Sequence, residues 1–87
     1  METALSCDII LASENAKFAL PEVKVGFFAA AGGVQRLSRQ IGKKAALEMI
    51  LTGRSVDAKE ALKLGIVNDV FSQSELLDKA IEKANVI

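Results

Sequence analysis

One glutamate, Glu22, has surroundings in the sequence that suit acid–base chemistry. Glu22 follows Pro21, the only proline, in the segment Phe18-Ala19-Leu20-Pro21-Glu22. Proline fixes its own φ and favours extended geometry in the residue before it, so we expect Glu22 on a rigid loop just past a strand. A rigid loop can hold an acid or a base in place. Glu22 could also be a solvated loop carboxylate without a function. Glu2 could be an exposed acid at the start of a helix that only complements the helix dipole.

A glycine pair, Gly32-Gly33, follows this segment and opens an amphipathic stretch. The pair lets the backbone turn sharply before a helix. It resembles a phosphate-binding loop, but no Lys-Ser/Thr follows, and turn geometry is a sufficient explanation. The helix expected next ends at Gly42 and carries three apolar residues on one face, namely Val34, Leu37 and Ile41.

The composition excludes several other chemistries. The chain has no histidine and a single cysteine, so His/Cys metal ligation, an internal disulfide and a Ser-His-Asp mechanism are excluded within it. Eleven basic residues balance eleven acidic ones without runs, which argues against nucleic-acid binding or a polybasic membrane patch. Cys7 is interpreted as a small core residue because no base accompanies it. With no signal-peptide pattern and no membrane-length apolar run, we expect a soluble, intracellular protein of undefined compartment.

The elements that would position these residues are short. The 87 residues, 51% of them apolar, are expected to form one small domain over 1–87. Strands are predicted at Asp8–Ala12 and Lys17–Ala19, and an extended segment at Ile66–Phe71. Three further helices are predicted: Lys43–Thr52 ending at Gly53, one from the N-cap Asp57 with Glu60 to Gly65, and one starting at Ser72 with Glu75. The last helix carries an apolar face made of Leu76, Leu77, Ala80, Ile81 and Ala84.

Two charged positions have structural interpretations. Glu48 lies in an apolar helix and is expected to be solvated or paired with Lys44, four residues earlier. Asp8 and Arg36 could form a structural ion pair or a cap. Neither position is assigned to the chemistry.

Taken in order, five motifs resemble the central section of the crotonase superfamily, the enoyl-CoA hydratases and isomerases. The motifs are Glu2 followed by Ala4–Ile10, Phe18–Glu22, Ala31–Leu37, Leu51–Arg54 and Ala58–Val67. The likeness extends over nearly all 87 residues. The Phe-Ala-Leu-Pro-Glu segment and the later Ser72–Leu76 are similar to relatives of carnitinyl-CoA dehydratase.

The resemblance implies an α/β fold. It is a partial ClpP/crotonase-like ββα spiral, helix-rich, and expected to lack the N-terminal strands and the C-terminal helical region of the family. The segments Asp8–Ala12 and Lys17–Ala19 would then lie on different layers of the spiral. Glu2 and Glu22 are expected to face a common cleft.

The resemblance also implies a site. Glu2 and Glu22 match the two catalytic glutamates of hydratases, which hold one water beside the α,β double bond of a thioester. One carboxylate activates the water for attack at C3, and the other handles the proton at C2. Substrate-binding positions are expected at Ala19, Leu20, Pro21, Phe27 and Phe28. The implied substrate is an acyl-CoA, with no metal and no cofactor besides the coenzyme A of the substrate itself.

Three functions remain open at this point. The retained glutamate pair favours an enoyl-CoA hydratase or dehydratase, a lyase whose activity is expected to be impaired in this chain. The family takes its oxyanion-hole donors from a glycine-rich turn before the first glutamate and from an earlier loop, which we do not find here. That favours a non-catalytic remnant that acts as an interaction module, and an enoyl-CoA isomerase is the third alternative. We expect a homo-oligomer or association with the rest of the fold, and no nucleic-acid or membrane partner.

Overall fold

The strands form two separate sheets of two strands each, in a computed structural model that describes all of residues 1–87. In the first sheet, β1 (Leu11–Ser13) pairs in parallel with β4 (Asp69–Phe71). In the second, β2 (Lys17–Ala19) pairs antiparallel with β3 (Ser55–Asp57), which places Phe18 opposite Val56. Each strand therefore has one edge that no other strand of this chain covers. The separation of the two predicted strands into different layers is confirmed.

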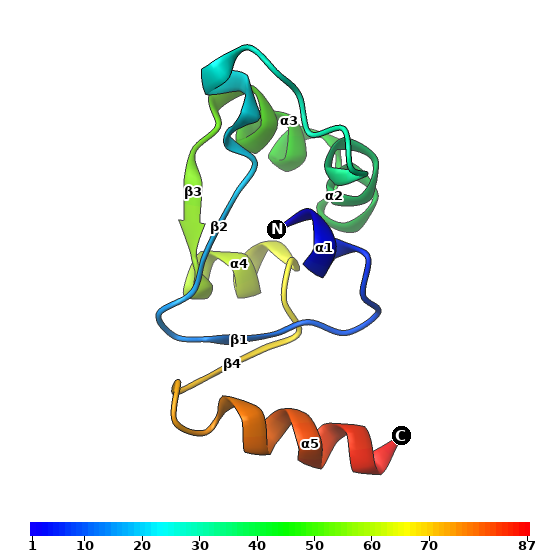
Figure 1. Cartoon of the computed structure of the whole chain (residues 1–87), viewed down its shortest axis with the longest axis vertical. Helices are drawn as coiled ribbons and strands as arrows, with labels where there is room; N and C mark the ends of the chain where they lie inside the picture. The colour runs from blue at the N-terminus through cyan, green and yellow to red at the C-terminus, as the bar shows by residue number, and fades with distance from the viewer.

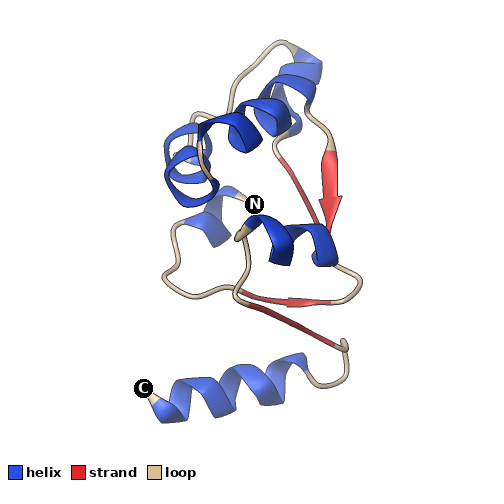
Figure 2. Cartoon of the chain, turned by 180° about the vertical axis from the view of Figure 1, so that it is seen from behind, coloured by secondary structure: helices blue, strands red, loops and turns tan.

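The helices are arranged along the long axis of a molecule that measures 40 × 23 × 20 Å (Figure 1). The 3₁₀ helix η1 (Pro21–Val25), α2 (Gly33–Ile41) and α3 (Lys43–Thr52) lie at one end. The short helix α1 (Glu2–Leu5) and α4 (Ala58–Leu64) lie in the middle, above the β1–β4 pair. Helix α5 (Leu76–Val86) lies beyond that pair at the opposite end, as the view from behind also shows (Figure 2).

Local signals explain where the central helices begin and end. The Asp57 carboxylate accepts the Glu60 backbone N–H at 2.8 Å, and α4 starts at the next residue, Ala58. This is the N-cap that the sequence predicts. Helix α3 ends at Gly53 in the left-handed conformation, where glycine is favoured because it has no Cβ. The predicted limits of α3 and the stop of α4 at Gly65 are confirmed.

The core extends from the end that contains α2 and α3 to the middle of the molecule. Its side chains are at most 4% exposed and come from α1, β1, β3, α2, α3, α4 and the segments that connect them. The cluster comprises Leu5, Ala12, Leu20, Ala29, Leu37, Ala46, Met49, Val56, Ala61, Ile66 and Val67. Leu37, predicted on the apolar face of α2, is completely buried. Helix α5 contributes no fully buried residue.

The first predicted strand was placed too early in the chain. The prediction put it at Asp8–Ala12, whereas β1 begins at Leu11. The Ile10 backbone N–H donates to the Asn68 side-chain oxygen at 2.8 Å, and the Asn68 backbone N–H donates to the Ile10 carbonyl at 2.7 Å. Asn68 thus ends the ladder with its side chain. The extended segment predicted at Ile66–Phe71 is shortened to β4, because Ile66 and Val67 donate to the Ala61 carbonyl at the end of α4.

The predicted start of the last helix was also wrong. Its first residue is Leu76, and the Ser72 carbonyl accepts the N–H groups of Glu75 and Leu76 in a turn that precedes it. The Ser72 hydroxyl lies 3.3 Å from the Ser74 hydroxyl instead of capping the helix. Cys7 is exposed, so its assignment to the core was wrong as well; its thiol lies against the Thr3 carbonyl.

Candidate functional site

Glu2 lies at the start of α1, and its carboxylate contacts the start of α2. One carboxylate oxygen accepts the Gly33 backbone N–H at 3.0 Å in a partly buried position. The first N–H groups of a helix have no partner within the helix, and the positive end of the dipole favours an anion there. The N-cap of α2, Gly32, has no side chain that could accept, and the first turn contains no acidic residue. Glu2 therefore supplies, from 31 positions away, the acceptor that α2 lacks locally.

Glu22 lies in η1, and its backbone is fixed on both sides. Pro21 begins the 3₁₀ helix, and Gly26 ends it in the left-handed conformation with φ 81°. The Glu22 carbonyl accepts the Phe27 N–H at 2.9 Å. In contrast, the carboxylate oxygen Oε2 of Glu22 is buried and has no hydrogen-bond partner. Buried polar atoms nearly always have one, so this oxygen is an exception that needs an explanation.

The segments that carry the two glutamates meet at Gly33. A Cβ placed on Gly33 would lie 3.1 Å from Cγ of Glu2 and 3.0 Å from Cδ2 of Leu20, two residues before Glu22. It would also lie 2.9 Å from Cβ of Ala29. The structure thus brings Glu2 and the segment leading into Glu22 against the same point of α2. That the two carboxylates share one water stays a prediction.

The predicted substrate positions differ widely in exposure. Leu20 is only 2% exposed and packs in the core, while Ala19 is half-buried and Pro21 exposed. Phe27 and Phe28 are 71% and 70% exposed, on the loop between η1 and α2. Large aromatic side chains are seldom left in solvent without a partner, so this loop is a surface on which a ligand or another protein segment can pack. Contact of these residues with a substrate stays a prediction.

An arginine outside the site, Arg54, joins two helices, α3 and α4. Its guanidinium lies 2.7 Å from a carboxylate oxygen of Glu48 in α3 and 2.7 Å from one of Glu60 in α4. Hydrogen bonding to the two carboxylates, that of Glu60 above all, raises the pKa of Arg54 further above its ordinary value. The hydrogen bond from Arg54 lowers the pKa of Glu60. The pairing of Glu48 with Lys44 was therefore wrong, because the ion pair forms with Arg54 instead.

The proposed ion pair between Asp8 and Arg36 does not form. The Arg36 guanidinium donates to the Ala31 carbonyl at 3.2 Å, across the turn that precedes α2. Asp8 and Arg36 both line one shallow polar hollow, without an ion pair between them. Arg36 thus acts on the Gly32-Gly33 turn.

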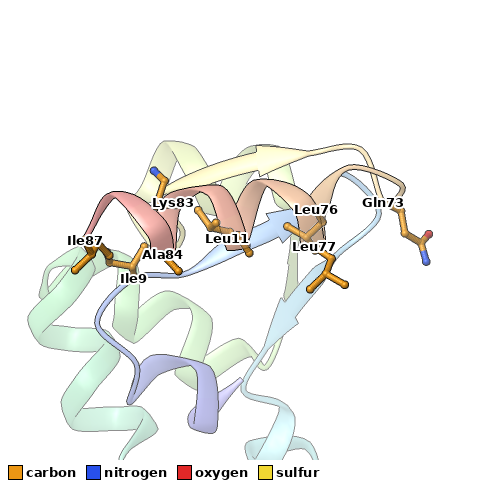
Figure 3. A pocket seen from close by; sticks show the side chains of 9 residues that line it. Ile9, Leu11, Gln73, Leu76, Leu77, Lys83, Ala84 and Ile87 are labelled. Carbon is orange, nitrogen blue, oxygen red and sulfur yellow. The ribbon is translucent and has the colours of Figure 1, made fainter.

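An apolar groove lies between α5 and β1, away from both glutamates (Figure 3). Its volume is about 520 Å³, and its lining is largely aliphatic: Ile9, Leu11, Gln73, Leu76, Leu77, Ala80, Lys83, Ala84 and Ile87. Figure 3 shows that the labelled side chains come from α5 and its two ends, from β1 and from the segment just before β1. We call this feature the α5 groove. Its polar residues, Gln73 and Lys83, provide no acid–base pair.

No three of the Cys, Asp and Glu side chains lie together as a metal site would require. None of the helices has both the length and the hydrophobicity needed to cross a membrane.

Comparison with known proteins agrees with the fold. The family model described as enoyl-CoA hydratase/isomerase matches residues 1–87. Among curated relatives, the chain is 45% identical over 84 residues to 2,3-dehydroadipyl-CoA hydratase of Escherichia coli and 52% identical over 83 residues to carnitinyl-CoA dehydratase of Salmonella paratyphi A. These alignments cover 97% and 95% of this chain, but 33% and 32% of the relatives.

A solved structure gives the same result. The crystal structure of an enoyl-CoA hydratase from Bacillus anthracis superposes with a TM-score of 0.92 at 43% identity, over 93% of this chain and 31% of that one. The chain therefore belongs to the enoyl-CoA hydratase/isomerase family. It spans about a third of the length of the relatives it matches, and its fold is the corresponding part of the crotonase fold.

The sequence analysis missed one contact of the site and one ion-pair bridge outside it. The bond between Glu2 and the Gly33 amide was missed, because the glycine pair was interpreted as a turn only. A signal for it existed: α2 begins without a capping side chain or a first-turn acid, which leaves its N–H groups open to a distant acceptor. The bridging role of Arg54 was missed too, since Arg54 was quoted only as part of a motif.

Proposed function

We propose that this chain supplies the acid–base residues of an enoyl-CoA hydratase or dehydratase acting on acyl-CoA thioesters. The observation that carries the proposal is the buried, unpartnered Oε2 of Glu22, on a backbone fixed by Pro21 and Gly26. Family membership and the placement of Glu2 beside the same corner of α2 support it. The names of the relatives indicate the substrate class.

The proposed reaction adds water across the α,β double bond of the thioester. One carboxylate accepts a proton from the water as its oxygen bonds to C3, and the other carboxyl group delivers a proton to C2 as the enolate collapses. The reverse sequence removes water. Charge that develops on the thioester oxygen needs N–H donors, and we propose that parts of the relatives that this chain does not match supply them.

Glu22 and Glu2 are the proposed catalytic residues. Ala19, Leu20 and Pro21 form the segment that leads to Glu22, and we propose that they position the substrate through their backbone, since Leu20 has a buried side chain. Phe27 and Phe28 are proposed to contact the acyl chain, because their exposed rings offer aromatic surface close in sequence to Glu22. No metal or separate cofactor takes part in this proposal.

The test is a chimera in which this chain replaces the 84 aligned residues of the E. coli relative. Its activity is measured with crotonyl-CoA and with 2,3-dehydroadipyl-CoA, and its folding by circular dichroism and thermal unfolding. We expect hydration, and Glu22→Gln should lower kcat by about 100-fold or more with little change in KM. The matched control is Glu14→Gln, at an exposed carboxylate in the turn between β1 and β2, which should leave both parameters unchanged.

Two results would contradict the proposal. One is a folded chimera that does not turn over either thioester, which would favour the role of an interaction module. The other is full activity after Glu22→Gln. Double-bond migration without hydration would assign the chain to an isomerase instead.

A further inference from the structure

Gly33 is a glycine that the backbone does not require. Its φ lies outside the left-handed region, unlike that of Gly32, and it is the first residue of α2, where alanine forms helices better than glycine. Local conformation therefore offers no reason for glycine here. The reason must lie in what surrounds the residue.

The surroundings of Gly33 leave no room for a side chain. Three heavy atoms would lie within 3.1 Å of an added Cβ: Ala29 Cβ, Leu20 Cδ2 and Glu2 Cγ. Ala29 and Leu20 are each 2% exposed and packed in the core, so they have little freedom to move. Glu2 is only half-buried and belongs to a helix of four residues, so it is the neighbour that can be displaced.

The same residue holds the carboxylate of Glu2 through its backbone amide, at 3.0 Å. Both properties act on one side chain, since the N–H fixes the carboxylate and the absent Cβ leaves space for the Cγ behind it. From these two contacts we infer that Gly33 is the positioning residue for Glu2 in the proposed reaction. This inference rests on the proposed function, but the hydrogen bond itself can be tested without activity.

The first experiment measures hydrogen exchange of the Gly33 amide by NMR in the 87-residue chain and in the chimera. If the Glu2 carboxylate holds this N–H, Glu2→Ala should accelerate its exchange about 10- to 100-fold, because hydrogen bonds to charged groups are strong. Glu14→Ala removes a carboxylate with no side-chain partner and should leave the rate unchanged. An unchanged rate after Glu2→Ala would overturn the inference, whatever the activity of the protein.

The second experiment is a double-mutant cycle in the chimera. Gly33→Ala should lower kcat about 10- to 100-fold with KM nearly constant, as expected when an acid or base is displaced by about 1 Å. When Glu2→Gln is already present, Gly33→Ala should have little further effect. A merely structural role would give the same loss in both backgrounds, and this additivity would overturn the inference.

The control for general destabilisation is Gly65→Ala. Gly65 has φ 87°, so alanine is strained there, but no atom lies within 4 Å of the added Cβ. It should lower thermal stability and leave kcat unchanged. If the parent chimera is folded but inactive, the proposed function fails, while the exchange experiment still decides whether Gly33 holds Glu2.

Discussion

The corner of the molecule where α1, η1 and α2 meet differs from the α5 groove at the opposite end in how its apolar side chains are covered. At the corner, Leu20 and Leu37 are 2% and 0% exposed, and even the backbone of Gly33 is in close contact. On α5, Leu77 and Ile81 are 70% and 50% exposed. The corner thus has its own core and can hold a carboxylate at a fixed position. The α5 groove has apolar surface without a cover from this chain.

The two regions also differ in how many elements of the chain pack together there. Packing at the corner depends on residues from α1 to α4. In contrast, α5 packs mainly against two strands, β1 and β4. A site that needs positional accuracy benefits from the first arrangement. Exposed apolar faces of the second kind are typical of surfaces that pack against further structure.

The largest expected difference between the two regions is in stability. Leu37→Ala should lower the free energy of unfolding by about 2–5 kcal/mol, because it leaves a cavity in the packed core. Leu77→Ala makes the same chemical change at an exposed position and should alter it by less than about 0.5 kcal/mol. Urea titration followed by circular dichroism measures both. Similar losses would show that α5 is packed in solution, contrary to the comparison.

The second difference is in how helices begin. The Asp57 side chain caps α4, so Asp57→Ala should cost about 0.5–2 kcal/mol. Glu75 occupies the N-cap of α5 without a side-chain hydrogen bond, so Glu75→Ala should change the unfolding free energy by less than about 0.5 kcal/mol. Thermal unfolding of the two variants measures both changes. A larger loss at Glu75 would indicate a cap that forms only in solution.

These two helix starts also show how far the sequence leads. Asp57 with Glu60, and the glycines at 42, 53 and 65, act within one turn of chain, so the limits of α2, α3 and α4 could be predicted from sequence. Asn68 ends the β1 ladder from 58 positions away, and no local pattern marks such a contact. The strand β3 is three residues long and depends on β2 as its partner, so it was not predicted.

The candidate site also has one feature with a local sequence signal and others that depend on the tertiary fold. The position of Glu22 after Pro21 is a local signal, and a constrained segment followed, although it is a 3₁₀ helix and not the loop expected. The contact of Glu2 with Gly33 joins segments 31 residues apart and depends on the tertiary fold. Likeness to a family identified both glutamates, but the amide that holds Glu2 and the arginine between Glu48 and Glu60 became visible only in the structure.

The third expected difference concerns the Arg54 bridge, which has no counterpart on α5 beyond the exposed pair of Lys79 and Glu82. Because the pKa of Glu60 is lower in the folded than in the unfolded chain, the pair stabilises the fold above the unfolded pKa, near 4.5, and loses this effect as the pH falls through the folded value. Arg54→Met should therefore lower the melting temperature at pH 7 more than at pH 3.

Salt gives the matching check for this bridge. The ion pairs are partly exposed, so the effect of Arg54→Met should shrink as the ionic strength rises. The variant Lys79→Met, which removes the exposed pair on α5, should change the melting temperature little at either pH. Equal effects of Arg54→Met at pH 7 and pH 3 would show that the guanidinium acts by packing and not through Glu60.

Substitutions in the α5 groove should have the smallest effect on stability. They should change the self-association of the chain instead. We expect the 87-residue chain to self-associate through this surface, since Leu77 and Ile87, which line the groove, are 70% and 88% exposed. Leu77→Gln should leave the unfolding free energy within about 0.5 kcal/mol of the parent chain and reduce the concentration dependence of the sedimentation coefficient. Leu62→Gln is the matched control, because Leu62 is 43% exposed on α4 and lies outside the groove. A chain that sediments as a monomer at every concentration, or an equal effect of the two substitutions, would show that the groove is not the associating surface.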